Sequence, residues 1–174
     1  DLPAIVNGVS MRFVPPLESA TLIRRYKRFL ADVERDGEPP FTVHCPNTGA
    51  MLGCAEPGSR VWLHKAANPK RKYPYTWELV EVADDTVVGV NTGRANGLVR
   101  EALEAGVIES LRHYTEIRAE VRFGLERSRV DFVLEADNVL PCYLEVKNVT
   151  ATAAEGVALF PDAVSERGTK HLRE

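Results

Sequence analysis

The chain has 174 residues, of which 44% are hydrophobic and 27% charged, close to the average for globular proteins, so extensive disorder is not expected. A formal net charge of −3 and a pI near 5.9 argue against polyanion binding by the whole surface, so any nucleic-acid contact must come from local basic patches. Three cysteines without disulfide-framework spacing, and no apolar run of transmembrane length, predict a cytoplasmic protein that does not contact a membrane.

Short strands are predicted through the first half of the chain. The apolar spacing in residues 21–33 fits a helix, but the β-rich composition and the Asp36-Gly37 turn favour a bent strand and a hairpin leading into residues 41–43. Further strand-like runs cover residues 59–64, 75–82 and 86–90. Short strands separated by Gly and Pro are typical of a small β-barrel, so we predict a first domain over residues 1–90.

Two basic clusters in this half are candidates for nucleic-acid binding. Residues 57–77 contain five cations and no acidic residue, and the rings of Tyr73 and Tyr75 lie among them. Cations can contact phosphates while neighbouring rings stack on unpaired bases. The alternative is a basic loop beside a solvated strand, with the rings in the barrel core. The candidates are Arg60, Lys70, Arg71, Lys72, Tyr73 and Tyr75, and a second cluster of Arg24, Arg25, Lys27 and Arg28 that shares the same surface.

The second half reads as a helix, three strands and a helix, an α/β layout that we assign to residues 91–174. The first helix starts at Ala95 and its pattern continues to about residue 114, with Gly106 as a break. The strands cover residues 116–123, 128–135 and 141–149. The last helix starts near Pro161 and carries Arg167 and Lys170, which could reach phosphate, although a surface ion pair of Lys170 with Glu166 is the simpler explanation.

The last two of these strands bring an aspartate opposite a Glu-x-Lys sequence. If their turn centres near Asp137-Asn138, Phe132 pairs with Leu144 and Asp131 lies across from Glu145, with Lys147 one pleat further on. Two carboxylates that face each other on a sheet repel. A divalent cation, or the ammonium group of Lys147, would offset that repulsion.

This arrangement suits the hydrolysis of phosphodiesters. Mg²⁺ binds hard oxygen ligands, often one or two carboxylates together with phosphate and water. Asp131, Glu145 and the carbonyl group of Val146 would supply such ligands, and Lys147 could stabilise charge at phosphorus or orient water. The alternative is a solvated strand face on which the lysine pairs with the carboxylates.

Several segments together resemble the sugar fermentation stimulation protein A family, from about residue 13 to the end of the chain. They are Leu-Ile-Arg-Arg-Tyr-Lys-Arg-Phe-Leu at 22–30, His-Cys-Pro-Asn-Thr-Gly-Ala-Met at 44–51, residues 69–77, Ser-Arg-Val-Asp-Phe at 128–132, Glu-Val-Lys-Asn-Val-Thr at 145–150, Phe-Pro-Asp-Ala-Val at 160–164 and Glu-Arg-Gly-Thr-Lys-His-Leu at 166–172.

The resemblance implies an N-terminal OB-fold that binds nucleic acid, followed by a restriction-endonuclease-like domain of the PD-(D/E)xK type, a mixed sheet flanked by helices. It places Asp131, Glu145 and Lys147 at the positions of that superfamily's catalytic residues. It also implies Mg²⁺ or Mn²⁺ as cofactor. Members usually continue beyond the Lys-His-Leu-Arg-Glu end seen here, so we expect a C-terminally incomplete sheet.

Two functions follow from these predictions. The first is a DNA-binding protein with a metal-dependent nuclease site, with RNA left open as a partner. The second is a non-catalytic DNA-binding regulator of sugar (maltose) metabolism, the role described for the family. A carbohydrate-binding role rests only on the family name and two tryptophans, Trp62 and Trp77. The sequence leaves the oligomeric state open, a homodimer included.

Overall fold

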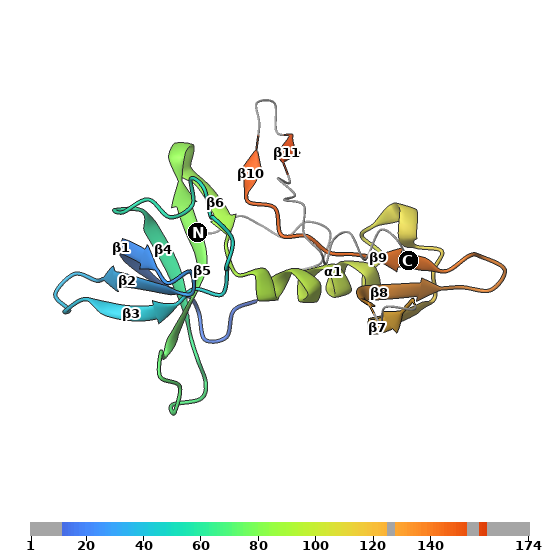
Figure 1. Ribbon diagram of the computed structural model, residues 1–174, viewed down its shortest axis with the longest axis horizontal. Helices are drawn as coiled ribbons and strands as arrows, with labels where there is room; N and C mark the ends of the chain where they lie inside the picture. The colour runs from blue at the N-terminus through green and yellow to red at the C-terminus, as the bar shows by residue number, and fades with distance from the viewer. Residues whose placement is uncertain (1–11, 125–127, 153–156, 160–174) are drawn as a thin grey trace. The chain divides into compact units, whose positions relative to one another are not determined.

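The structure is a computed structural model of the 174-residue chain, and it describes residues 12–124, 128–152 and 157–159 (Figure 1). These residues divide into two compact units. One contains residues 12–94 with 148–152 and 157–159, and the other contains residues 95–124 and 128–147. The predicted last helix from Pro161, with Arg167 and Lys170, lies outside the described residues.

The first unit is built around a closed five-stranded barrel. Its strands are β1 (Glu18–Tyr26), β2 (Leu30–Glu34), β3 (Phe41–His44), β4 (Arg60–Lys65) and β5 (Tyr75–Val82). Antiparallel pairs join β3 to β2, β2 to β1, β1 to β4 and β4 to β5, and a parallel pairing of β3 with β5 closes the ring. A further strand, β6 (Thr86–Gly89), pairs antiparallel with β5. The predicted small barrel is confirmed, with the closed, five-stranded form of an OB-fold.

Alternating side chains explain the barrel's core. Along β4 the residues at every second position, Val61 and Leu63, are completely buried, and Trp77 and Val80 of β5 are buried beside them. Successive side chains of a strand point to opposite faces, so this spacing fills the barrel interior and leaves the other face to solvent. The buried apolar cluster consists of Ala20, Leu22, Ala31, Val33, Val43, Cys45, Met51, Cys54, Val61, Leu63, Trp77, Val80 and Val90.

Residues 21–33 form two strands, so the bent-strand prediction is confirmed in kind and the helical alternative is wrong. The strand β1 bends at a bulge between Leu22 and Arg24, and the chain then reverses through residues 27–29 into β2. This extra reversal was not predicted, because Lys27 and Arg28 both have positive φ (49° and 63°), a conformation that normally favours Gly or Asn. The predicted Asp36-Gly37 turn does join β2 to β3, with Gly37 at φ 78°.

The second unit pairs a helix with a three-stranded antiparallel sheet. The helix α1 (Ala95–Glu104) is followed by a 3₁₀ turn at Glu109–Leu111 and by β7 (Glu116–Phe123), β8 (Ser128–Glu135) and β9 (Cys142–Leu144), in the order β7-β8-β9. The helix stops where Gly106 was predicted to break it. Gly106 donates its N–H to the carbonyl of Leu103, and Val107 donates to Ala102, which satisfies the carbonyls of the last turn.

Two short strands complete the described chain, β10 (Ala151–Thr152) and β11 (Ala158–Leu159), paired with each other in the first unit. Single 3₁₀ turns lie at Ala83–Asp85 and Thr92–Arg94. Within the described residues, no helix has the length and apolar character needed to cross a bilayer.

Candidate metal centre and nucleic-acid surface

The predicted register of the β8–β9 hairpin is confirmed. Phe132 pairs with Leu144, and the two pairs that follow, up to Leu134 with Cys142, keep the same register. The strand β9 is shorter than predicted, because the chain leaves the ladder after Leu144. The N–H of Val146 then donates to Oδ2 of Asp131 at 2.7 Å rather than to a strand carbonyl. Asp131 is thus held directly against the Glu-x-Lys segment.

A second donor, from the helix, holds the other oxygen of this carboxylate. The Nδ2 group of Asn96, in the first turn of α1, donates to Oδ1 of Asp131 at 2.9 Å. Both donors are neutral, and among the described residues no Lys or Arg forms an ion pair with Asp131. A carboxylate oxygen has two lone pairs, so each oxygen of Asp131 retains capacity to bind a cation.

Glu145 and Lys147 lie on either side of the residue that contacts Asp131. The Nζ group of Lys147 lies 2.7 Å from Oε1 of Glu145, and the two side chains are 48% and 30% exposed. The pair is therefore open to solvent, where a salt bridge contributes little to stability. The ammonium group of Lys147 can therefore leave Glu145 for a ligand at a small cost in free energy.

The neighbouring strand is distorted at the same level. Glu120 of β7 has a φ of 54°, and it lies between the pairs Ala119–Phe132 and Val121–Val130, at the level of Asp131. A left-handed residue other than Gly or Asn inside a strand is uncommon and costs about 1 kcal/mol or more. Such conformations concentrate at functional sites, which is in keeping with a site at Asp131.

The donor set determines which metal ion fits. Asp131 and Glu145 offer carboxylate oxygens, and Val146 offers a carbonyl. Over the ranges that the structure describes, no group of three or more His, Cys, Asp or Glu side chains could hold a metal ion. Two carboxylates and a carbonyl suit Mg²⁺, which retains several water ligands, and they do not suit zinc, which prefers Cys and His.

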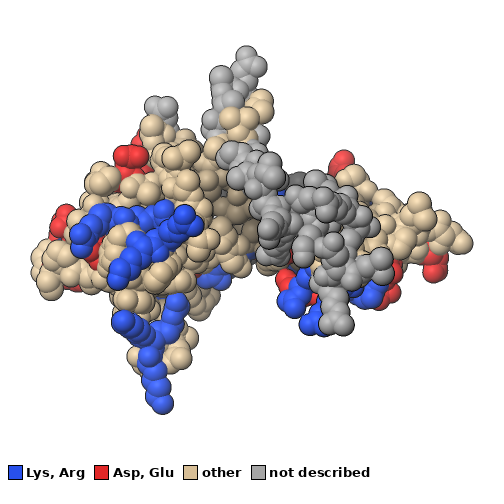
Figure 2. Space-filling model, viewed as in Figure 1, with Lys and Arg blue, Asp and Glu red and all other residues tan. Residues whose placement is uncertain are grey.

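In the first unit, the strand register places two basic loops on either side of the C-terminal end of β3. Tyr26 pairs with Leu30, Leu30 with His44, His44 with Thr76, and Thr76 with His64, so these residues form a row across the five strands. The β1–β2 turn (27–29) and the β4–β5 loop (66–74) both leave the barrel there. Figure 2 shows Lys and Arg side chains on the barrel, including those where the β4–β5 loop projects at the bottom of the view.

Four of the predicted cations extend into solvent from these two loops. Lys27 and Arg28 are exposed in the turn, and Lys70 and Lys72 are exposed in the loop. The Nζ group of Lys72 lies 5.4 Å from the centre of the half-buried Tyr73 ring.

Two other predicted contact residues, Arg25 and Arg71, make internal contacts. Nη2 of Arg25 donates to the carbonyls of Arg28, Asn47 and Gly49 at 2.8–2.9 Å, which fastens the turn to the segment after β3. In the loop, Nη1 of Arg71 donates to Oγ1 of Thr76 at 3.1 Å.

The remaining three predicted contact residues lie in different surroundings. Arg24 pairs with Asp32 at 2.9 Å on the outer face of the barrel. The Tyr75 ring packs 5.6 Å from that of Phe41, and its hydroxyl donates to Glu18. Arg60 pairs with Thr21 in the middle of β1, five residues from Tyr26, so the structure does not bring it to the loops.

Two titratable groups on the barrel have shifted pKa values. Partial burial raises the pKa of Asp32, but hydrogen bonds from Thr42, Arg24 and Tyr26 outweigh that effect, and the net pKa is below its ordinary value. Burial, followed by the nearby Arg71 guanidinium, lowers the pKa of His44. The positive charge beside this row therefore comes mainly from the lysines and arginines.

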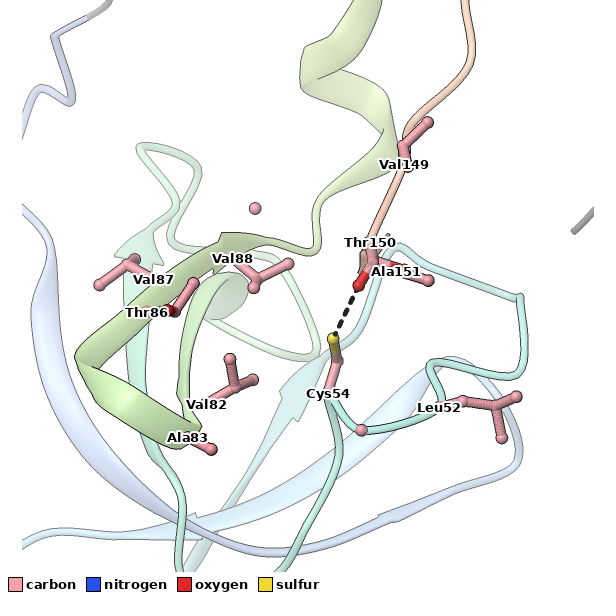
Figure 3. Close-up of a pocket in the computed structure, with 12 residues that line it drawn as sticks. Leu52, Cys54, Val82, Ala83, Thr86, Val87, Val88, Val149, Thr150 and Ala151 are labelled. Carbon is pink, nitrogen blue, oxygen red and sulfur yellow. Dashed lines mark hydrogen bonds between the residues drawn. The ribbon is translucent and has the colours of Figure 1, made fainter. Parts of the chain in front are cut away.

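A hollow of about 670 Å³ also lies in the first unit, between the loop after β3, the β5–β6 hairpin and residues 149–151 (Figure 3). Its lining includes Leu52, Val82 and Val88. The Cys54 thiol donates to the carbonyl of Thr150 at 3.7 Å. Burial raises the pKa of this thiol, so it stays protonated at neutral pH and is a poor nucleophile. The contact fastens the returning chain to the barrel and provides no catalytic group.

Two family models match consecutive parts of the chain. The one described as "SfsA N-terminal OB domain" matches residues 23–90, and the one described as "Sugar fermentation stimulation protein RE domain" matches residues 93–174. The chain belongs to the sugar fermentation stimulation protein family. The resemblance found in the sequence motifs is therefore confirmed.

Individual relatives agree with this membership. The chain is 60% identical over 164 residues to a sugar fermentation stimulation protein homolog from Alkalilimnicola ehrlichii, covering 93% of this chain and 69% of the relative. It is 58% identical to a homolog from Thioalkalivibrio sulfidiphilus, covering 94% and 68%. A solved structure, Pyrococcus furiosus SfsA in complex with Ca²⁺, matches with a TM-score of 0.78 at 23% identity, covering 95% of this chain and 68% of that one, and shows the shared fold.

Proposed function

We propose that this chain binds DNA and hydrolyses its phosphodiester bonds at a divalent metal ion held by Asp131 and Glu145. The observation that carries the proposal is the contact between Asp131 and the Val146 amide, 2.7 Å long, because it fixes a carboxylate beside the Glu-x-Lys segment. A solvated strand face with an incidental ion pair needs no such contact.

Each residue around the candidate centre has a separate role in the proposed reaction. Asp131 and Glu145, with the carbonyl of Val146, would hold Mg²⁺ or Mn²⁺. When bound, such an ion neutralises phosphate charge and lowers the pKa of a bound water molecule. Lys147, paired with Glu145 at 2.7 Å, is placed to move its ammonium group to a phosphate oxygen. Asn96 and the Val146 amide keep the Asp131 carboxylate in a fixed orientation.

Two further observations support this function. The family model for residues 93–174 names an RE domain, and restriction-endonuclease-like domains are the setting in which the Asp and Glu-x-Lys pattern serves phosphodiester hydrolysis. The related Pyrococcus furiosus protein is described in complex with Ca²⁺, a divalent ion that also prefers oxygen ligands. In this chain the proposed ion is Mg²⁺ or Mn²⁺, since the described residues offer two carboxylates at this site.

A cleavage assay tests the proposal. Wild type is incubated with single- and double-stranded DNA and RNA in the presence of Mg²⁺, Mn²⁺ or EDTA. We expect metal-dependent cleavage that is lost in Glu145→Gln and in Lys147→Ala. Glu135→Gln is the matched control, because Glu135 lies on β8 two pleats from Asp131 and pairs with Arg118.

Two outcomes would contradict the catalytic proposal: no cleavage by wild type under any of these conditions, or cleavage undiminished by the site substitutions. Salt-dependent DNA binding without cleavage, unaffected by EDTA, would favour a non-catalytic regulator instead.

A further inference from the structure

We infer that the surface of the barrel between the β1–β2 turn and the β4–β5 loop binds a single nucleic-acid strand, with the ring of Phe29 as the stacking platform for an unpaired base. The inference rests on the proposed nucleic-acid binding and does not depend on cleavage. Phe29 was not among the residues predicted from sequence to contact nucleic acid.

Phe29 presents its ring to solvent from a fixed backbone. The residue is 46% exposed, whereas the next residue, Leu30, is buried in the barrel. The Phe29 carbonyl accepts the N–H of Cys45 at 2.8 Å, which extends the β2–β3 ladder and ties the residue to its neighbours. A single exposed apolar side chain is common on protein surfaces, so the case depends on what surrounds the ring.

The two residues before Phe29 are cations in a costly conformation. Lys27 and Arg28 have successive positive φ angles, where Asn and Gly would form the turn with less strain. A turn selected only for stability would not place two long cationic side chains there. Their presence beside an exposed ring provides the pairing of charge and aromatic surface that single-strand binders use.

The turn is also held rigid before any ligand binds. Arg25 spans from the turn to the segment after β3, because its Nη2 group donates to the carbonyls of Arg28, Asn47 and Gly49. A platform that is already ordered loses less conformational entropy on binding. Arg25 thus acts on the turn and is not itself available to phosphate.

The β4–β5 loop supplies complementary charge on the other side of the row. Lys70 and Lys72 are exposed there, and Arg71 bonds to Thr76, which pairs with His44, the neighbour of Leu30. In OB-folds these two loops, with the face of strands 2 and 3, bind oligonucleotides. A nucleic-acid backbone that crosses the surface between the two loops would meet cations from both, with the Phe29 ring next to the turn.

The ring distinguishes a single strand from a duplex. A duplex has its bases stacked on each other and presents mainly phosphates, so it would gain only the charge contacts. An unpaired base can lie on the Phe29 ring, a contact that contributes about 1–3 kcal/mol in proteins that bind single strands. The same surface therefore favours the single strand.

Fluorescence anisotropy tests the inference with a labelled 20-nucleotide oligothymidylate and a duplex of equal length, in EDTA so that cleavage plays no part. We expect the single strand to bind at least about tenfold more tightly than the duplex. Phe29→Ala should weaken single-strand binding by about tenfold or more and leave duplex binding and the salt dependence unchanged. Leu52→Ala is the matched control, since Leu52 is an 80% exposed apolar residue elsewhere on the barrel.

A second variant distinguishes the loss of the ring from misfolding of the protein. Phe29→Trp keeps a ring at the position, so it should retain affinity, and its fluorescence should be quenched by the single strand and not by the duplex. Equal or tighter duplex binding, or single-strand binding unchanged in Phe29→Ala, would overturn the inference while leaving metal-dependent cleavage untouched. Absence of any nucleic-acid binding would overturn this inference and the DNA-binding part of the proposed function together.

Discussion

Two carboxylates in this molecule are each held by an asparagine amide, and they differ in what else holds them. In the barrel unit, Glu78 accepts Nδ2 of Asn91 at 2.8 Å and both Nε and Nη2 of Arg94 at 3.1 and 2.9 Å. In the other unit, Asp131 accepts Nδ2 of Asn96 at 2.9 Å and a backbone amide at 2.7 Å.

The difference lies in the compensating charge. The Glu78 side chain is only 1% exposed, and its charge is neutralised by Arg94, whose own pKa is raised by the hydrogen bonds to Glu78 against the opposing effect of burial. Asp131 is half-buried and, from the residues that the structure describes, receives only neutral donors. A buried carboxylate that is paired with a bidentate arginine has its charge compensated within the fold. A carboxylate oriented by neutral donors is fixed in place and can still bind a cation.

The largest effect is expected at Asp131, the carboxylate held by neutral donors. Asp131→Asn should abolish Mn²⁺ binding in titration calorimetry and lower the cleavage rate by about a hundredfold or more, because the metal ion loses a charged ligand. The free energy of unfolding should change little, since the substituted amide can still accept a hydrogen bond from Val146. Wild-type Mn²⁺ affinity in this variant would show that the cation is held elsewhere.

The next largest effect is expected on stability, at Glu78, whose charge is neutralised by Arg94. Glu78→Gln should lower the free energy of unfolding by about 3 kcal/mol, because Arg94 loses its charged partner in a largely buried setting. Urea denaturation followed by tryptophan fluorescence measures this change. Glu81→Gln, a half-buried position on the same strand, should cost much less. Equal losses in the two variants would mean that the ion pair with Arg94 is not what stabilises this region.

A smaller effect is expected at the residue that orients Asp131. Asn96→Ala should weaken Mn²⁺ binding by about tenfold, since groups that orient a metal ligand typically contribute 10- to 100-fold in affinity. Arg100→Ala, on the exposed face of the same helix, removes a surface pair with Glu104 and should leave the affinity unchanged. If both variants weaken binding alike, the loss comes from the helix as a whole and not from the amide of Asn96.

The smallest effect is at Asp32, on the outer face of the barrel. Because its folded-state pKa lies below the ordinary value, its stabilising contribution is complete above about pH 4 and is lost as the pH falls through the folded pKa. Asp32→Asn should therefore cost about 1 kcal/mol at pH 7 and less near pH 2. Thermal unfolding at the two pH values measures the difference, and an equal cost at both would contradict a charge-based role.

Local patterns were sufficient to predict most of the strands. The bounds of β5, β7 and β8 follow from alternating side chains and agree with the structure, and the β8–β9 register follows from the position of the turn. The β1–β2 turn could not be predicted in this way, because Lys27 and Arg28 are not turn formers and their conformation is maintained by a distant contact, the Arg25 bonds to residues 47 and 49.

The candidate site was predictable only in part, for a related reason. Asp131, Glu145 and Lys147 lie close together along a hairpin, so spacing alone indicates that they are neighbours. Asn96 comes from a helix 35 residues before Asp131, and an asparagine in the first turn of a helix is too common to single out. The end of β9 at Leu144 was missed because it depends on the Asp131 side chain, which competes with the strand ladder for the Val146 amide.

The discontinuous make-up of the barrel unit has a consequence for the order of events on the ribosome. Residues 12–94 emerge first, but residues 148–151, whose Thr150 carbonyl accepts the Cys54 thiol, are translated only after the whole of the second sheet. At synthesis rates of about 5–20 residues per second, residues 148–151 follow the barrel strands by several seconds. Completion of the barrel unit is therefore delayed until Lys147, the last residue of the candidate site, has been made.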